Sequence, residues 1–123
     1  MTNMRVEKKV YDLEERTALF GESAIEFAYT LSRDAVTTPL ISQFIRSSTS
    51  VGANYCEADD AESKRDFRHK IAISRKEARE AKYWLRMIAK ACPGSKESAR
   101  PLWQEAKELH LIFSKIRRNT VAD

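Results

Sequence analysis

Apolar residues recur at intervals of three and four along four separate segments of this chain, which begin at Leu13, Ile41, Phe67 and Leu102. Such spacing gathers the apolar side chains on one face of an α-helix. Its persistence over several turns is typical of helices that pack against one another at shallow angles. Only three Gly and three Pro stand among 123 residues, so little in the chain interrupts long helices. The pattern therefore predicts an all-α protein.

The four segments predict helices near residues 11–32, 38–58, 63–92 and 98–119. The connections between them are short, and short connections make consecutive helices antiparallel. We therefore expect a single domain over residues 1–123, with the fold of an antiparallel up-down-up-down four-helix bundle.

Residues that favour helix ends stand near these boundaries. Thr38, which precedes a Pro, is typical of an N-cap before the first helical position. Ser63 with Asp66 three residues later resembles a capping box. In the last segment we expect Pro101 in the first helical turn and Ser98 as the cap.

The chain carries no sign of a membrane segment or a leader. No apolar run approaches the roughly 18–20 residues that span a bilayer. The first residues have no hydrophobic stretch after their basic residues, which argues against a signal peptide and predicts a cytoplasmic protein. Cys56 and Cys92 are too few for a disulfide framework and lack the spacing of metal ligands, so we expect reduced, partly buried thiols.

Residue patterns typical of catalysis are largely missing. Neither a P-loop nor a dinucleotide fingerprint occurs. A di-iron bundle needs paired Glu-x-x-His motifs, and the chain offers a single Asp66-x-x-His69. The acidic run from Glu57 to Glu62 lacks the spacing of an EF-hand and is expected at a loop between helices. We therefore predict no catalytic residue, metal or cofactor, with a hydrolase that uses Glu57 and Glu77 as a less favoured alternative.

Positive charge is concentrated in one segment. Residues 62–90 hold ten Lys/Arg against four Asp/Glu, whereas the rest of the chain holds twelve against fourteen. In the predicted third helix, five cations that we call the basic strip fall on neighbouring positions of one face: Arg68, Arg75, Arg79, Lys82 and Arg86. Cations interleaved with aromatic residues can contact phosphates and bases. Alternatively they form ion pairs, with Glu80, with Glu15, Glu22 and Glu26 of the first helix, or across a subunit interface.

Polar residues stand close to the expected buried face of the second and third helices. The set consists of Ser47, Ser50, Asn54, Glu57, Ser74 and Glu77. Burying such a group without a partner costs roughly 1–3 kcal/mol, so each is expected to be paired. Asn54 and Glu57 are neighbours on one helix face, and Ser74 and Glu77 have the same spacing on the next helix. We predict that the two pairs meet in one hydrogen-bonded cluster with a structural role.

Apolar residues also occur outside the four series. They are Ile25, Tyr29, Ile73, Trp84, Met87, Trp103 and Ile112. A monomeric bundle of this size has little use for all of them, and surplus apolar edges favour an interface between copies of the chain. We therefore expect a homo-oligomer.

The pattern Arg46-Ser47-x-x-Ser50-Val51-x-x-Asn54-x-x-Glu57, followed by Asp66-Phe67 and by Ile71-Ala72-x-Ser74-x-x-Glu77, resembles the bacterial four helix bundle protein family. That family includes proteins encoded within intervening sequences of 23S ribosomal RNA genes, and it is related to the accessory variability proteins of diversity-generating retroelements. The resemblance covers about residues 11–118, although Ala58 stands where the family commonly has Gly.

The resemblance implies an antiparallel bundle that assembles as a ring-like pentamer with a central channel. It implies no established enzymatic activity, and RNA or a nucleoprotein as the suggested ligand. Our hypothesis is a non-enzymatic homo-oligomer that binds RNA or a nucleoprotein partner through the basic strip. The alternative is a protein–protein adaptor in which intersubunit salt bridges occupy the basic strip.

Overall fold

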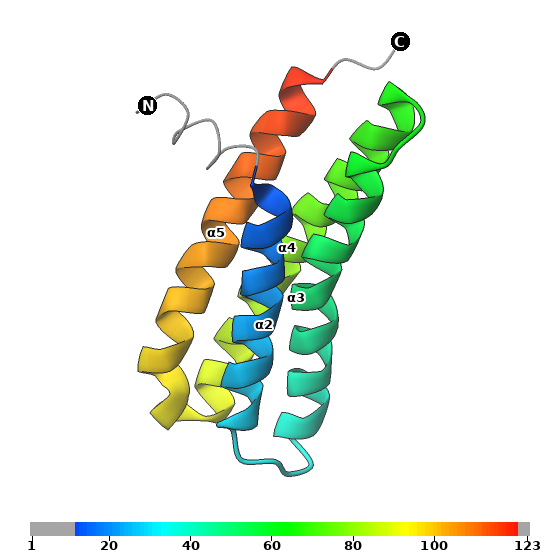
Figure 1. Cartoon of the computed structure of the whole chain (residues 1–123). Helices are drawn as coiled ribbons and strands as arrows, with labels where there is room; N and C mark the ends of the chain where they lie inside the picture. The colour runs from blue at the N-terminus through cyan, green and yellow to red at the C-terminus, as the bar shows by residue number, and fades with distance from the viewer. Residues whose placement is uncertain (1–11, 121–123) are drawn as a thin grey trace.

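The structure is a computed structural model that describes residues 12–120. Within that range the chain forms helices α2 (Leu13–Tyr29), α3 (Thr37–Asp59), α4 (Lys64–Ala91) and α5 (Lys96–Asn119), with a 3₁₀ turn at Pro93–Ser95 before α5. Successive helices run antiparallel, and their short connections alternate between the two ends of the bundle (Figure 1). Each helix packs against its neighbours, while α2 and α4 lie at diagonally opposite corners. The predicted four-helix bundle is confirmed.

The predicted helix bounds differ from the structure by up to three residues. Helix α3 begins at Thr37 rather than Thr38, because the Asp34 carboxylate accepts bonds from the backbone N–H groups of Val36 (2.8 Å) and Thr37 (2.9 Å). The cap therefore comes from the loop. At α4 the prediction was right, since the Ser63 hydroxyl accepts a bond from the Asp66 backbone N–H at 3.0 Å.

Helix α5 begins two residues earlier than predicted. The 3₁₀ turn leads directly into it at Lys96, and the Ser98 hydroxyl donates to the Ser95 carbonyl at 3.1 Å instead of capping the helix. Pro101 consequently lies inside the helix, beyond its first turn. Helix α2 ends at Tyr29, three residues before the predicted end at residue 32, where the Thr30 hydroxyl donates to the Phe27 carbonyl at 2.6 Å; its predicted start at residue 11 lies outside the described residues.

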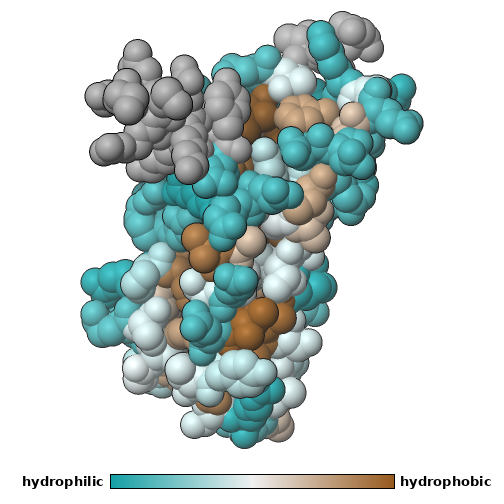
Figure 2. Space-filling view, viewed as in Figure 1, coloured by the Kyte–Doolittle hydropathy of each residue, from teal (hydrophilic) through white to brown (hydrophobic). Residues whose placement is uncertain are grey.

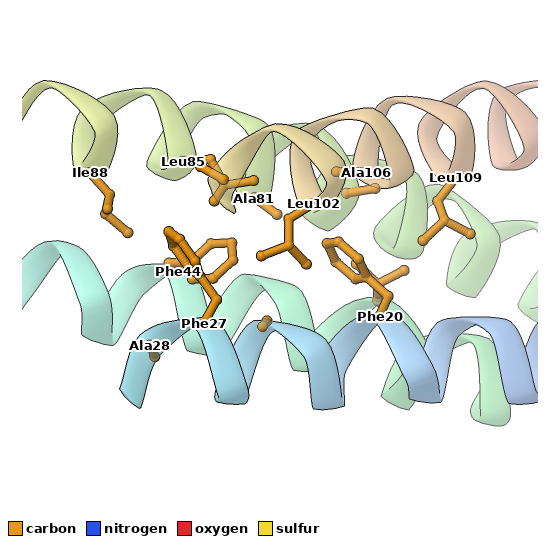
Figure 3. Packing of buried hydrophobic residues seen from close by; sticks show 14 of the residues in the cluster. Phe20, Phe27, Ala28, Phe44, Ala81, Leu85, Ile88, Leu102, Ala106 and Leu109 are labelled. Atoms are coloured by element: carbon orange, nitrogen blue, oxygen red, sulfur yellow. The ribbon is translucent and has the colours of Figure 1, made fainter. Parts of the chain in front are cut away.

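The predicted apolar series form the core. Figure 3 shows side chains from all four helices meeting on the bundle axis, with Leu102 of α5 lying toward Phe20 and Phe27 of α2. Phe27 and Phe44 pack edge to face, with their ring centroids 5.9 Å apart. Aromatic pairs of this geometry add roughly 0.5–1.5 kcal/mol beyond the burial of their area. The core therefore holds the helix faces, and with them the outer surfaces, in fixed positions.

Helices α2 and α3 approach each other closely at Gly52. A Cβ atom added there would lie 3.0 Å from the Thr17 hydroxyl oxygen, whereas one added at Gly21 would lie 3.7 Å from its nearest neighbour, Thr49. The Thr17 hydroxyl is held by donation to the Leu13 carbonyl at 2.7 Å. Gly52 is thus required for helix packing in a way that Gly21 is not.

The apolar residues outside the series differ in exposure: Ile73, Trp84, Met87 and Ile112 are half-buried, whereas Ile25, Tyr29 and Trp103 are exposed. Trp84 and Ile112 are half-buried and pack against the core. In contrast, Ile25 and Tyr29 of α2 are exposed, Tyr29 to 78%, and Leu19 of the same helix is exposed as well. The face that carries α2 shows hydrophobic side chains set among hydrophilic ones (Figure 2). The surplus apolar surface is therefore richest on α2.

Candidate nucleic-acid interface

The basic strip lies along the seam between α4 and α5. The Arg68 Nε donates to the Thr120 carbonyl at 3.0 Å, and the Arg75 Nε donates to the Ser114 hydroxyl at 3.1 Å. The Lys82 ammonium stands 5.2 Å from the centroid of the Trp103 ring. These contacts place the strip beside α5, a neighbour that the sequence analysis did not identify.

Four carboxylates of α4 and α5 face away from this seam. Glu77 and Glu80 of α4 form ion pairs with Arg46 of α3, at 3.0 Å for Glu77. Glu105 and Glu108 of α5 form ion pairs with Arg16 of α2, at 2.8 and 2.9 Å. Among residues 12–120, no member of the basic strip takes part in an ion pair.

Helix α5 adds cations to the same seam. They are Lys96 and Arg100, which line a hollow together with Arg86, and Lys107, whose ammonium lies 5.6 Å from the centroid of the Trp103 ring. Arg100 also pairs with the exposed Glu97 at 3.5 Å. The seam thus gathers more positive charge than the strip alone.

The positive charge of the seam affects the pKa of His110. Its Nδ1 lies 3.2 Å from the Arg75 carbonyl oxygen within the α4–α5 seam. Burial lowers the pKa of His110 below its usual value, the bond to the Arg75 carbonyl opposes that shift, and the charges of Arg75, Lys82 and Arg79 lower the pKa further. The seam therefore favours the neutral imidazole, as expected where cations converge.

Among the described residues, ion pairing does not occupy the basic strip. Glu80 pairs with Arg46 and accepts a bond from the Trp84 indole N–H at 3.3 Å, so it faces α3. Glu15, Glu22 and Glu26 belong to α2, at the corner diagonally opposite α4. The predicted pairs with Glu80 and with α2 are therefore wrong, and ion pairing between two copies of the chain stays a prediction.

The polar residues of the second and third helices link α3 to α4 at three levels. Glu77 pairs with Arg46, the Ser74 hydroxyl donates to the Val51 carbonyl at 3.0 Å, and Lys70 pairs with Glu57 at 2.9 Å. These links succeed one another along two antiparallel helices. They fix the register of α3 against α4, and hence the direction in which the basic strip points.

The remaining polar residues bond within α3. The Ser47 hydroxyl donates to the Phe44 carbonyl at 3.2 Å, the Ser50 hydroxyl to the Arg46 carbonyl at 2.6 Å, and the Asn54 amide to the Ser50 carbonyl at 2.9 Å. The prediction of a single cluster joining Asn54 and Glu57 to Ser74 and Glu77 was wrong. Side chains of successive helical turns reach different levels of the neighbouring helix, so each finds a separate partner.

Sequence reasoning missed two features of this region. It grouped Trp84 and Trp103 together, but Trp84 packs on the core whereas Trp103 stands outside it among lysines. The spacing of Trp103 and Lys107, four apart on one helix, was the available signal. The helical spacing places Ser48 on the buried face of α3, as observed, but it did not predict that the Ser48 hydroxyl would have no hydrogen-bond partner in the described part of the chain.

The structure also bears on the cysteines, on a metal site and on a membrane span. Cys56 is exposed rather than partly buried, and its thiol lies 3.7 Å from a Glu14 oxygen, while Cys92 is half-buried. No three His, Cys, Asp or Glu side chains of residues 12–120 converge where a metal ion could bind. None of helices α2 to α5 is both long and apolar enough to cross a membrane.

Comparison with known proteins places the chain in a family. The family model described as 23S rRNA-intervening sequence protein matches residues 11–115. A crystal structure of a protein of unknown function from the S23 ribosomal protein family of Bacteroides thetaiotaomicron VPI-5482 is similar over 86% of this chain and 98% of that chain, with 27% sequence identity and a TM-score of 0.76. No curated protein matches. Since the family model covers most of the chain, this protein belongs to the 23S rRNA-intervening sequence protein family.

Proposed function

We propose that this protein is a non-enzymatic, cytoplasmic homo-oligomer that binds RNA, free or within a nucleoprotein, along the α4–α5 seam. The observation that carries the proposal is the separation of charge on α4 and α5. Carboxylates Glu77, Glu80, Glu105 and Glu108 pair with Arg46 and Arg16 on the outer sides, and the five cations of the basic strip take part in no ion pair within residues 12–120. A surface of this kind attracts a polyanion, because bound phosphates release counterions.

The dimensions of the strip suit an extended strand. From Arg68 to Arg86 the rise along α4 is about 27 Å, at about 1.5 Å per residue. The strip offers cations but no recognisable base-reading motif, so binding should be electrostatic and weakly dependent on sequence. With about five phosphate contacts and a slope of roughly −0.7 for each on a single strand, the logarithm of affinity should fall with the logarithm of salt at about −3.5.

The test is the salt dependence of RNA binding, measured by fluorescence anisotropy with a labelled single-stranded oligonucleotide. Changing Arg75, Arg79 and Lys82 together to Gln should weaken binding and bring the slope to about −1.4, since about two contacts of about −0.7 remain. Circular dichroism should show that the bundle is still folded. Absence of binding by the wild type at about 50 mM salt would refute the proposal.

A matched control separates a local effect from a change in net charge. Arg33, Arg65 and Lys76 are exposed and lie outside the basic strip. Changing these three to Gln removes the same charge, yet the slope should stay near the wild-type value. An equal loss of slope in both triple variants would mean that RNA contacts the whole surface rather than the seam.

A second candidate is a protein–protein adaptor whose basic strip pairs with α2 of a neighbouring copy. The supporting observation is that exposed Glu15, Glu22 and Glu26 lie on the helix diagonally opposite α4, so one copy presents acidic and basic edges at opposite corners. Contacts between unlike surfaces of identical subunits close into rings when the rotation permits. Five is the number of subunits that the family resemblance implies.

The mass of the assembly distinguishes the two candidates. Under the adaptor candidate, the triple Gln variant of Arg75, Arg79 and Lys82 should dissociate, and light scattering should show a smaller particle than for the wild type. Under the RNA candidate the mass should not change. A wild-type mass near the 14.1 kDa of one chain would refute a homo-oligomer altogether.

A further inference from the structure

Trp103 stands in unusual surroundings for a tryptophan. It is 37% exposed and belongs to α5, where it lies outside the buried core. Two ammonium groups approach its ring, Lys82 from α4 at 5.2 Å and Lys107 from the next turn of α5 at 5.6 Å. The other tryptophan, Trp84, differs in both respects, since it packs against the core and donates its indole N–H to Glu80.

A hollow adjoins the Trp103 ring between α4 and α5. Its volume is about 450 Å³, and its apolar lining includes Leu85, Ala89 and Ala99. Arg86, Lys96 and Arg100 also line it. Small-ligand sites commonly have volumes of about 300–1,000 Å³, a mostly apolar lining and a few charged groups. The hollow therefore joins a flat aromatic surface, an apolar floor and cations in one place.

We propose that Trp103 is a stacking platform for an unpaired base, so that the ligand of the α4–α5 seam is single-stranded RNA rather than a duplex. This inference rests on the proposed function. Trp103 and its hollow lie at the Arg86 end of the basic strip, so a strand whose phosphates follow the strip can place a base on the indole. A base has a flat apolar face, whereas its phosphate needs cations, and the seam offers both. In a duplex the bases are stacked on one another and cannot reach the ring.

Tryptophan fluorescence can test whether a base stacks on Trp103. In a Trp84→Phe variant, Trp103 is the only tryptophan, and oligoadenylate of about 12 nucleotides, within the ~4–16 that single-strand binding modules cover, should quench its fluorescence. In the matched Trp103→Phe variant, which retains Trp84 on the α3 side of α4, the same titration should leave the fluorescence unchanged.

Affinity gives a second, independent readout. Trp103→Ala should weaken oligoadenylate binding by about 5- to 150-fold, the effect of losing one base–aromatic stack. Trp103→Phe should recover part of that loss. An RNA duplex of the same length and inorganic polyphosphate offer no unpaired base. The affinities of the wild type and of Trp103→Ala for either of these two ligands should therefore agree within about twofold.

Each possible outcome decides the matter. Salt-dependent RNA binding that Trp103→Ala leaves unchanged would overturn the stacking platform and leave the proposed function intact. No binding of any nucleic acid by the wild type would overturn both. A smaller particle in light scattering for Trp103→Ala would show that a second copy of the chain covers the ring. Equal weakening of polyglutamate and RNA binding by Trp103→Ala would identify an acidic peptide as the occupant.

Discussion

Replacing Gly52 by Ala should destabilise the bundle, whereas replacing Gly21 by Ala should stabilise it. Both residues lie inside helices, where Ala is favoured over Gly by about 0.8–1.0 kcal/mol. At Gly21 the new methyl group would lie at ordinary contact distance, 3.7 Å from Thr49, so the full gain should appear. At Gly52 it would lie 3.0 Å from the Thr17 hydroxyl oxygen, and overpacking of this kind costs about 1–3 kcal/mol. The net change at Gly52 should be a loss of up to about 2 kcal/mol.

Urea denaturation at a fixed protein concentration measures the difference, because the midpoint shifts by roughly 0.3–1 M for each kcal/mol. A double-mutant cycle with Thr17→Ala tests the cause. Removing the Thr17 hydroxyl takes away the closest contact of the new methyl group, so Gly52→Ala should cost less in the Thr17→Ala background than in the wild type. Equal stabilisation by Gly21→Ala and Gly52→Ala would refute the close packing of α2 against α3.

Two further predictions concern buried polar groups. Ser48→Ala should stabilise the protein by about 1–3 kcal/mol, because it removes a fully buried hydroxyl with no partner among the described residues; a lower melting temperature would contradict this. Stability should also fall as the pH is lowered through and below 6.5, because the pKa of His110 is lowered in the folded chain and the unfolded chain takes up this proton first. His110→Gln should flatten that part of a pH series of urea midpoints, and an unchanged profile would show that His110 is not responsible.

The sequence predicted the core and the fold because a helix with one buried face has apolar residues at every third or fourth position. The residues of the four series line the bundle axis, with Tyr55, Phe67 and Ile116 half-buried. Helix ends were predicted less well, because their caps depend on loop geometry. Asp34 caps α3 from three residues upstream of Thr37, a contact that only the folded loop creates.

The candidate site shows a different limit of sequence reasoning. Helical spacing predicted that Arg75 and Lys82 share a face, but it contains no information on which helix lies beside that face. The bundle places α5 there, with Ser114 and Trp103 as the contacts, and it places the acidic α2 out of reach. The same limit explains why the two tryptophans were grouped together.

The positions of the exposed apolar residues indicate which surface is expected to contact another copy of the chain and which surface is expected to bind RNA. The core of a protein–protein interface is depleted in charged residues and enriched in large apolar ones. Leu19, Ile25 and Tyr29 are exposed on α2, whereas α4 and α5 together expose Tyr83, Trp103 and Leu111, of which Trp103 lies among the lysines of the seam. Burying the strip under another copy would desolvate several cations for little apolar gain, and each would need a well-placed carboxylate to offset that cost. A contact centred on α2 would bury the three apolar side chains of that helix, although Glu22 and Glu26 of the same helix would then need partners. We therefore expect α2 to supply the contacts between copies and the α4–α5 seam to stay open to RNA.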